Sequence, residues 1–278
     1  MTPRVTVVTD SAASIPPELV EGLGIVVVPM SVIIGGTPHP DGELSIEEVM
    51  ARAGEGVSTS GPSPGEVLQA VEGREGDVLL LTVSRQMSST FKAANAAARM
   101  VGDRARVMDT GTAAGAEGLV VLAAAEAAAR GAPVDVVQQA ARRVIERVRL
   151  IATVDSLDRL VQSGRVPGVA GLASRWLGMQ PLFEFRDGRA RPLRPAFSRE
   201  AALERMLTAW RQSTVPNADL HVAALHAQAE GDAAALLDAV REEVKPVTAF
   251  AAPFSAVMVA HTGMGLVGLS WWWDEEQG

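Results

Sequence analysis

The chain has 278 residues, of which 47% are hydrophobic and 21% charged, the proportions of a globular protein with a sizeable core. It contains no cysteine, which excludes disulfides and thiolate catalysis, and its formal net charge of −8 argues against nucleic acid as a partner. No apolar run approaches the roughly eighteen residues of a membrane span, and the amino terminus lacks a signal-peptide pattern. We therefore expect a cytoplasmic protein that does not span a membrane.

The first half of the chain alternates short apolar strands with helices. Strands are predicted at 4–9, 25–33, 77–83 and 105–109. Helices are predicted at 16–22, from Ser45 to about 53, after Ser63, at 88–101, at 115–130 and at 134–147. Ser45 with Glu48 and Ser63 with Glu66 both match the capping box. Short buried strands separated by helices predict a parallel sheet with helices on both faces, in a domain covering residues 1–150.

The pattern changes near residue 150. A strand is predicted at 150–155, a short helix ending at Gly164, a hairpin around Asp187-Gly188, helices at 199–212 and 232–243, and strands at 219–225, 246–250, 256–260 and 266–273. Hairpins mixed with helices indicate a second, α+β domain over residues 151–278. The run Trp271-Trp272-Trp273 is compatible with the two faces of a strand and with an exposed contact patch.

Hydroxyl-rich segments follow three of the apolar strands. They are Thr9-Asp10-Ser11, Ser84 to Thr90 and Asp109 to Thr112, and Ser58 to Ser63 has the same chemistry. The carboxyl ends of parallel strands meet at one edge of a sheet, where ligands bind. Each Ser or Thr taken alone is most often a helix N-cap, but several together suit a small anionic group. Ser88, directly after a wholly apolar strand, is the strongest candidate.

Two further motifs add basic groups. Arg165 follows Gly164 at a predicted helix end, where its guanidinium could contact a carboxylate or phosphate in a bidentate manner or simply be solvated. His261 follows the apolar run 256–260 and opens the glycine-rich sequence Thr262-Gly263-Met264-Gly265. A turn that needs two glycines indicates close backbone approach beside this histidine.

The same residues leave open an enzymatic alternative. Ser88 and His261, with Asp10 or Asp109, have the composition of a hydrolase triad. However, the chain has no G-x-S-x-G elbow, no phosphate-binding loop, no dinucleotide fingerprint and no H-E-x-x-H metal motif. The residues therefore favour binding over catalysis, with no catalytic residue, metal or cofactor expected.

The motifs in chain order resemble those of the bacterial DegV family of fatty-acid-binding proteins. The resemblance rests on Thr9-Asp10-Ser11, Thr59 to Glu66, Ser84 with Met87 to Phe91, Asp109-Thr110, Leu157 to Arg165, and His261 to Gly265. It covers essentially the whole chain. The order of several motifs makes it specific, where any one alone would not be.

The resemblance implies a three-layer α/β/α domain with a parallel sheet, followed by a two-layer α/β domain with a mixed sheet. One long-chain fatty acid would lie in a tunnel between the domains, with its carboxylate presented to a separate fatty acid kinase for phospholipid metabolism. The implied site residues are, for the carboxylate, Thr59, Ser60, Ser88 and His261; for presentation to the kinase, Arg165; and in support, Asp10, Ser11, Thr90 and Thr262.

Some positions depart from the family pattern. Ser89 stands where the family usually has glycine, Gly61 where it often has glutamine, and Met264 where it has proline. Gln180 and Phe197 each stand where a basic residue is common. The hydroxyl anchors are kept. The segment from Val166 to Met179 is compatible with a tunnel wall and with an ordinary core helix, and the alternatives to a lipid carrier are an acyl-ester hydrolase and a binder of a smaller anion.

Overall fold

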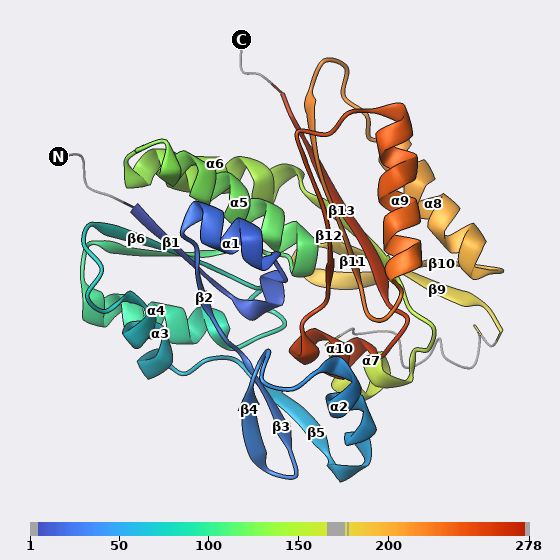
Figure 1. Ribbon diagram of the computed structural model, residues 1–278, viewed down its shortest axis with the longest axis horizontal. Coiled ribbons are helices and arrows are strands. Elements are labelled where there is room, and N and C mark those ends of the chain that lie inside the picture. The colour runs from blue at the N-terminus through green and yellow to red at the C-terminus, as the bar shows by residue number, and fades with distance from the viewer. Residues whose placement is uncertain (1–4, 166–175, 177, 276–278) are drawn as a thin grey trace.

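The computed structural model describes residues 5–165, 176 and 178–275. Three sheets organise these residues (Figure 1): a four-stranded sheet, a six-stranded sheet and a small three-stranded sheet. Residues 166–175 and 177 of the predicted tunnel wall lie outside the described residues. In the part of the chain that the structure describes, no helix combines the length and apolar composition that crossing a bilayer requires.

The first sheet is wholly parallel, in the order β2-β1-β6-β7. Its strands are β1 (Val5–Asp10), β2 (Val26–Val28), β6 (Asp77–Thr82) and β7 (Ala105–Asp109). Helices α3 (Pro64–Val71) and α4 (Thr90–Val101) pack on one face, and α1 (Pro17–Leu23), α5 (Ala114–Ala129) and α6 (Val134–Arg147) cover the other. This confirms the predicted three-layer domain. Both predicted capping boxes are present, at Ser45 and Ser63.

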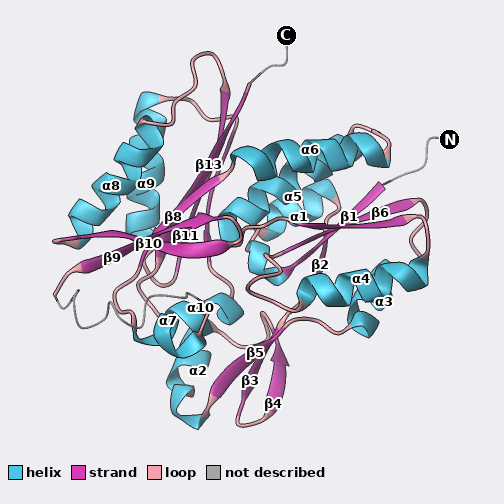
Figure 2. Cartoon of the chain, turned by 180° about the vertical axis from the view of Figure 1, so that it is seen from behind, coloured by secondary structure: helices cyan, strands magenta, loops and turns pink. Residues whose placement is uncertain are grey.

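The second sheet is mixed, in the order β10-β9-β8-β13-β11-β12. Its strands are β8 (Arg149–Thr153), β9 (Gln180–Arg186), β10 (Arg189–Ala196), β11 (Asp219–His226), β12 (Thr248–Pro253) and β13 (Val267–Asp274). Only β11 and β12 run parallel within it. Helices α8 (Arg199–Arg211) and α9 (Glu230–Glu243) cover its outer face, as Figure 2 shows from behind. The predicted mixed-sheet domain is thereby confirmed.

Helix α5 serves both large sheets. It contacts β1 of the first sheet and β11 and β13 of the second, so its sides are buried nearly all round. Small residues make this possible. A Cβ at Gly115 would lie 3.1 Å from Ala223 Cβ in the second sheet, and one at Gly118 would lie 3.0 Å from the Ala13 carbonyl oxygen beside the first. The Ala-rich composition of this helix is therefore a packing requirement.

The third sheet corrects the predicted strand at 25–33. The chain breaks at Pro29 into β2 and β3 (Ser31–Ile34), and β3 pairs antiparallel with β4 (Thr37–Pro40) and β5 (Val57–Ser60). Proline supplies no N–H to a ladder and restricts the residue before it, so a continuous strand was the wrong expectation. Thr59 and Ser60 consequently lie on a strand of this small sheet. Helix α2 (Ile46–Ala51) lies beside this sheet (Figure 1).

The strand predicted at 256–260 is wrong. These residues belong to helix α10 (Ala256–Thr262), capped by the Ser255 hydroxyl, which accepts a hydrogen bond from the Met258 N–H. A short apolar run cannot by itself distinguish a buried strand from a buried helix, and the N-cap serine was the missed signal. Helix α10 packs against α7 (Asp158–Ser163), which brings the His261 and Arg165 motifs together.

The three consecutive tryptophans lie on β13, and all of them are buried. Trp272 stacks on His221 and belongs to the core that contains α5, while Trp271 and Trp273 belong to the core under α8 and α9. They therefore occupy the two faces of one strand.

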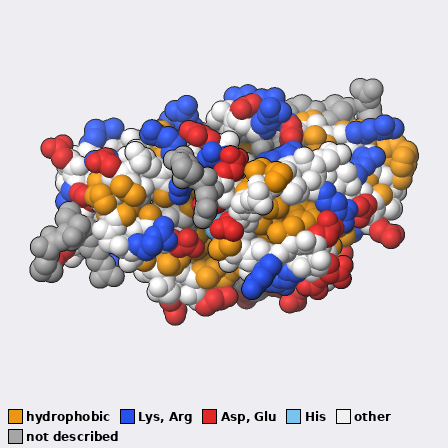
Figure 3. Space-filling model, turned by 90° about the horizontal axis from the view of Figure 1, so that it is seen from above, with side chains coloured by type: hydrophobic (Ala, Val, Ile, Leu, Met, Phe, Trp, Pro, Cys, Tyr) orange, Lys and Arg blue, Asp and Glu red, His pale blue; other side chains and the backbone are white. Residues whose placement is uncertain are grey.

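On the molecular face seen in Figure 3, basic and acidic side chains are interspersed.

Candidate functional site

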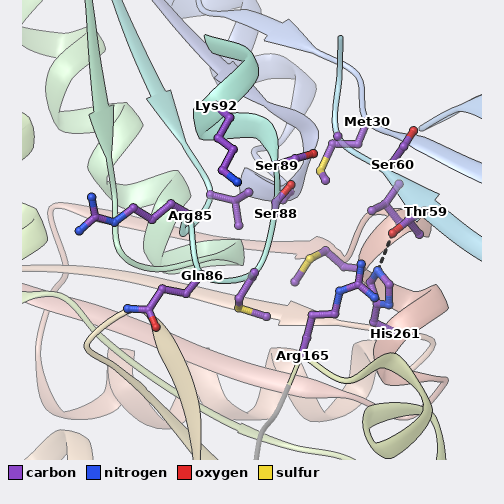
Figure 4. A pocket seen from close by; sticks show the side chains of 16 residues that line it. Met30, Thr59, Ser60, Arg85, Gln86, Ser88, Ser89, Lys92, Arg165 and His261 are labelled. Atoms are coloured by element: carbon purple, nitrogen blue, oxygen red, sulfur yellow. Dashed lines mark hydrogen bonds between the residues drawn. The ribbon is translucent and has the colours of Figure 1, made fainter. Parts of the chain in front are cut away.

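A cavity of about 450 Å³ lies where the small sheet, the first sheet and α10 meet; we call it the head cavity. Its lining residues come from both halves of the chain. They are Ala12, Met30, Thr59, Ser60, Gly61, Val83, Arg85, Gln86, Met87, Ser88, Ser89, Lys92, Arg165, Val257, Met258 and His261. The structure thus brings together all four predicted carboxylate ligands and Arg165 (Figure 4).

His261 and Thr59 form one side of the head cavity. His261 Nε2 lies 2.7 Å from Thr59 Oγ1, a hydrogen bond that joins α10 to β5 across 202 positions of sequence. Burial, and secondarily the charge of Arg165, lower the pKa of His261 to about 4. The imidazole is therefore neutral near pH 7, with one ring nitrogen that donates a hydrogen bond and one that accepts.

Arg165 reaches the head cavity from the end of α7. Gly164 ends this helix with a φ of +66°, the left-handed conformation that glycine adopts at little cost. The Arg165 guanidinium donates to the Ser163 carbonyl oxygen at 2.8 Å, which holds the charged end of the side chain beside His261. The helix end therefore aims a permanent positive charge into the cavity.

Ser88 lines another side of the head cavity and is hydrogen-bonded to Thr90, which does not line it. Their hydroxyl oxygens lie 2.8 Å apart, and the Thr90 N–H donates to Ser88 Oγ at 3.2 Å, at the start of α4. Gly61 packs directly on this pair, because a Cβ there would lie only 2.7 Å from Thr90 Oγ1. The hydrogen bonds thus link Ser88 to Thr90 and His261 to Thr59, and the Ser88–His261 pairing of a hydrolase is not formed among them.

The predicted supporting residues surround the head cavity without lining it. Asp10 is buried, accepts from the Ala12 and Val83 N–H groups at 3.1 and 2.9 Å, and so joins the ends of β1 and β6. Burial raises the pKa of Asp10 to about 6. Ser11 donates to Asp41 at 2.6 Å and accepts from the Met30 N–H at 3.1 Å. These contacts brace the loops that carry the cavity residues.

The charge of the cavity lining is opposite to that of the chain. Arg85, Lys92 and Arg165 line the head cavity, and its described lining includes no acidic side chain. Arg85 is held at the rim by Asp109, at 3.2 Å. Sequence reasoning missed Lys92, which lies on the first turn of α4; its position only four residues after Ser88 in the chain was the available signal. The described lining therefore carries positive charge, and among the described residues no cluster of three metal-ligating side chains forms.

A second cavity, of about 80 Å³, adjoins the first and differs in chemistry; we call it the tail cavity. It lies between α10 and the second sheet, and most of its side chains are apolar. They are Met87, Ala113, Ala114, Leu150, Ala152, Val154, Leu160, Phe183, Glu184, Phe185, Ala190, Phe254, Met258, Thr262 and Leu266. Thr262, predicted to support the head group, lines this cavity, and its hydroxyl donates to the Met258 carbonyl oxygen at 3.1 Å.

The turn between β9 and β10 locks onto the loop that leads to Ser88. Ser84 Oγ donates to the Gly188 carbonyl oxygen at 2.7 Å, and Gln86 Nε2 donates to that of Asp187 at 3.0 Å. A Cβ at Gly188 would lie 2.9 Å from Ser84 Oγ, so the contact needs glycine. This latch ties the two large sheets together beside both cavities.

Known proteins resemble this chain along nearly all of its length. The DegV family model matches residues 4–273. A DegV domain-containing protein of Streptomyces coelicolor is 33% identical over 280 residues, covering 97% of this chain and 98% of the relative. A fatty acid-binding protein of Thermotoga maritima is 28% identical over 281 residues, covering 95% and 96% respectively.

Solved structures agree with the sequence matches. A DegV family protein of Thermus thermophilus, described for its fatty acid binding, superposes with a TM-score of 0.90 at 28% identity, covering 97% of this chain and 99% of the other. DegV of Bacillus subtilis, a fatty acid binding protein, gives 0.86 at 26% identity, covering 98% and 100%. By fold and by sequence, the chain belongs to the DegV family.

Proposed function

We propose that this protein binds one long-chain fatty acid, with the carboxylate in the head cavity and the acyl chain in the tail cavity. The observation that carries the proposal is the direct adjacency of a cationic, hydroxyl-lined cavity and an apolar one. An amphiphile with a single anionic end matches this pair of cavities. The fatty-acid-binding relatives of the same fold support the same ligand class.

The carboxylate ligands are proposed to be Thr59, Ser60, Ser88 and His261. Hydrogen bonds to a charged acceptor contribute about 1.5–3 kcal/mol each, so a few such contacts fix the head group. Each methylene of the chain that is buried adds about 0.8 kcal/mol, so the tail supplies most of the affinity. Binding pockets for small molecules measure about 300–1,000 Å³, so a tail cavity of about 80 Å³ must widen by side-chain movement when a long chain enters.

The ligand is proposed to lie between units 1–150 and 151–278. Ser88 comes from the first unit and His261 and Arg165 from the second, which supports a position of the anionic end between the two units. The head cavity has a polar lining and is bounded by the exposed side chain of Arg85, so its rim lies at the protein surface. We propose that Arg165 helps to present the carboxylate there to a separate fatty acid kinase, so that this chain acts as a carrier without a catalytic residue.

Mass spectrometry of lipid extracted from the purified protein tests the ligand class, and native mass spectrometry tests the ratio of one fatty acid per chain. Ser88→Ala should weaken hexadecanoate binding by about tenfold to a hundredfold, the loss of one charged hydrogen bond. Ser58→Ala is the matched control, because Ser58 is an exposed serine of β5 that does not line the head cavity. Protein that carries no fatty acid and binds none added back would exclude the proposal.

A kinase assay tests presentation. With a purified fatty acid kinase and ATP, acyl phosphate should form only when the loaded protein is present. Arg165→Ala should lower the rate of acyl phosphate formation more than it lowers hexadecanoate affinity. The hydrolase alternative predicts turnover of a chromogenic ester that Ser88→Ala abolishes, and the small-anion alternative predicts that phosphate displaces a fluorescent fatty acid.

A further inference from the structure

Two methionines stand between the head cavity and the tail cavity. Among the described residues that line these cavities, Met87 and Met258 are the two that line both. Both side chains are half-buried. A molecule that occupies both cavities must therefore pass between these two side chains, which we call the neck.

The neck lies next to the residues proposed to hold the carboxylate. Met87 directly precedes Ser88 on the loop that leads to α4. Met258 lies three residues before His261 on α10, so both side chains are on the same face of that helix. Two chain segments thus each supply one head-group ligand and one neck residue. The neck consequently surrounds the first few carbons of a bound chain, close to its carboxylate.

Methionine suits this position because it is unbranched and adaptable. Its three rotatable bonds allow the thioether to move aside for a straight chain and to close around it afterwards. Each neck residue is also anchored through its backbone: the Met87 N–H donates to the Ser84 carbonyl oxygen at 2.9 Å, and the Met258 carbonyl oxygen accepts from Thr262. The side chains can move while their Cα positions are held.

We infer that Met87 and Met258 are specificity-determining residues, which favour acyl chains that are straight next to the carboxylate over chains branched there. This inference rests on the proposed function. A methyl branch at the second carbon would lie in the neck, where its added volume must displace the two thioethers further than a straight chain does. The head cavity itself is too roomy, at about 450 Å³, to make this distinction.

The test compares hexadecanoate with 2-methylhexadecanoate by calorimetric titration of the full-length protein. Wild type should bind the branched acid about tenfold more weakly, a difference of about 1.4 kcal/mol. Met87→Ala and Met258→Ala should each bring the two dissociation constants to within about threefold, because truncation leaves room for the branch. The ratio is measured within one variant, so a fraction of unfolded protein does not change it.

Met30→Ala is the matched control, since Met30 lines the head cavity and not the tail cavity. It should keep the ratio of about ten. Equal binding of both acids by wild type, or the same ratio in all three variants, would overturn the inferred role of Met87 and Met258 in specificity. The proposed function would be unaffected by that result. Failure of wild type to bind either acid would overturn both.

Discussion

Because His261 is neutral in the folded protein, part of the pH dependence of folding stability can be assigned to this one residue. The pKa of this buried imidazole is lowered from its ordinary 6.5 to about 4. Above about pH 6.5 the folded and unfolded chains both hold it neutral, so its contribution to stability is fully present. As the pH falls towards 4, the unfolded chain takes up a proton that the folded chain does not, and stability is lost.

The size of the loss follows from the two pKa values. One pKa unit corresponds to about 1.4 kcal/mol, so the free energy of unfolding should fall by about 3 kcal/mol over the whole interval from 6.5 to about 4. Between about pH 7.5 and pH 4.5 the expected change is about 2.5 kcal/mol. His261→Gln keeps a polar group beside Thr59 and cannot titrate, so it should lack this part of the pH dependence.

The measurement is urea unfolding of wild type and His261→Gln at several pH values in that interval. The difference between the two proteins isolates the imidazole, because every other titrating group contributes to both. Bound hexadecanoate should shrink the change, since a carboxylate beside His261 favours the imidazolium. A difference in unfolding free energy that stays constant with pH to within about 0.5 kcal/mol would refute a depressed pKa.

Three further predictions concern stability. Glu117 is fully buried, and its pKa is raised well above the ordinary value, chiefly by burial and then by the nearby charge of Asp10. The free energy of unfolding should therefore fall as the pH rises above about 4.5, and in urea titrations Glu117→Gln should show a smaller fall in that free energy than wild type. Gly265→Ala would place a Cβ 1.8 Å from the Asp155 carboxylate, but that side chain is exposed and can turn away, so this variant and Gly24→Ala, which shares the left-handed backbone and has open space, should each cost about 1–2 kcal/mol; a loss for Gly265→Ala more than about 2 kcal/mol above that for Gly24→Ala would show that the carboxylate is held in place. Ser84→Ala, which leaves the carbonyl of the β9–β10 turn without its donor, should cost about 1–3 kcal/mol in the same assay, and an unchanged midpoint would show that the latch adds nothing.

Much of the fold was predictable because its local signals agree with one another. The capping boxes at Ser45 and Ser63 and the turn at Asp187-Gly188 all have their expected structures. One error came from overlooking Pro29, which divides the predicted strand at 25–33, and the other came where a short apolar run has no distinguishing period. Residues 256–260 form a helix instead of a strand, and the decisive contact, the cap at Ser255, lies outside the run itself.

The sequence was enough to predict which residues gather at the candidate site, but not which of them hydrogen-bond to one another. Thr59, Ser88 and His261 were expected together, and they line one cavity. That His261 contacts Thr59 instead of Ser88 depends on β5 pairing with β3, a non-local pairing that spacing cannot supply. Lys92 was missed for a related reason, because a lysine on a helix is ordinarily a solvated side chain.

Helix α5 bears on how a ligand can enter. Because one helix is packed on both large sheets, with Gly115 against one and Gly118 against the other, the two halves of the molecule cannot swing apart without breaking a shared core. A hinge of the kind that opens many two-domain binding proteins is therefore unavailable. For the proposed ligand, uptake and release would then proceed through local rearrangement of the cavity walls, and exchange rates should respond to substitutions at those walls more than to substitutions in the segment that joins the two halves.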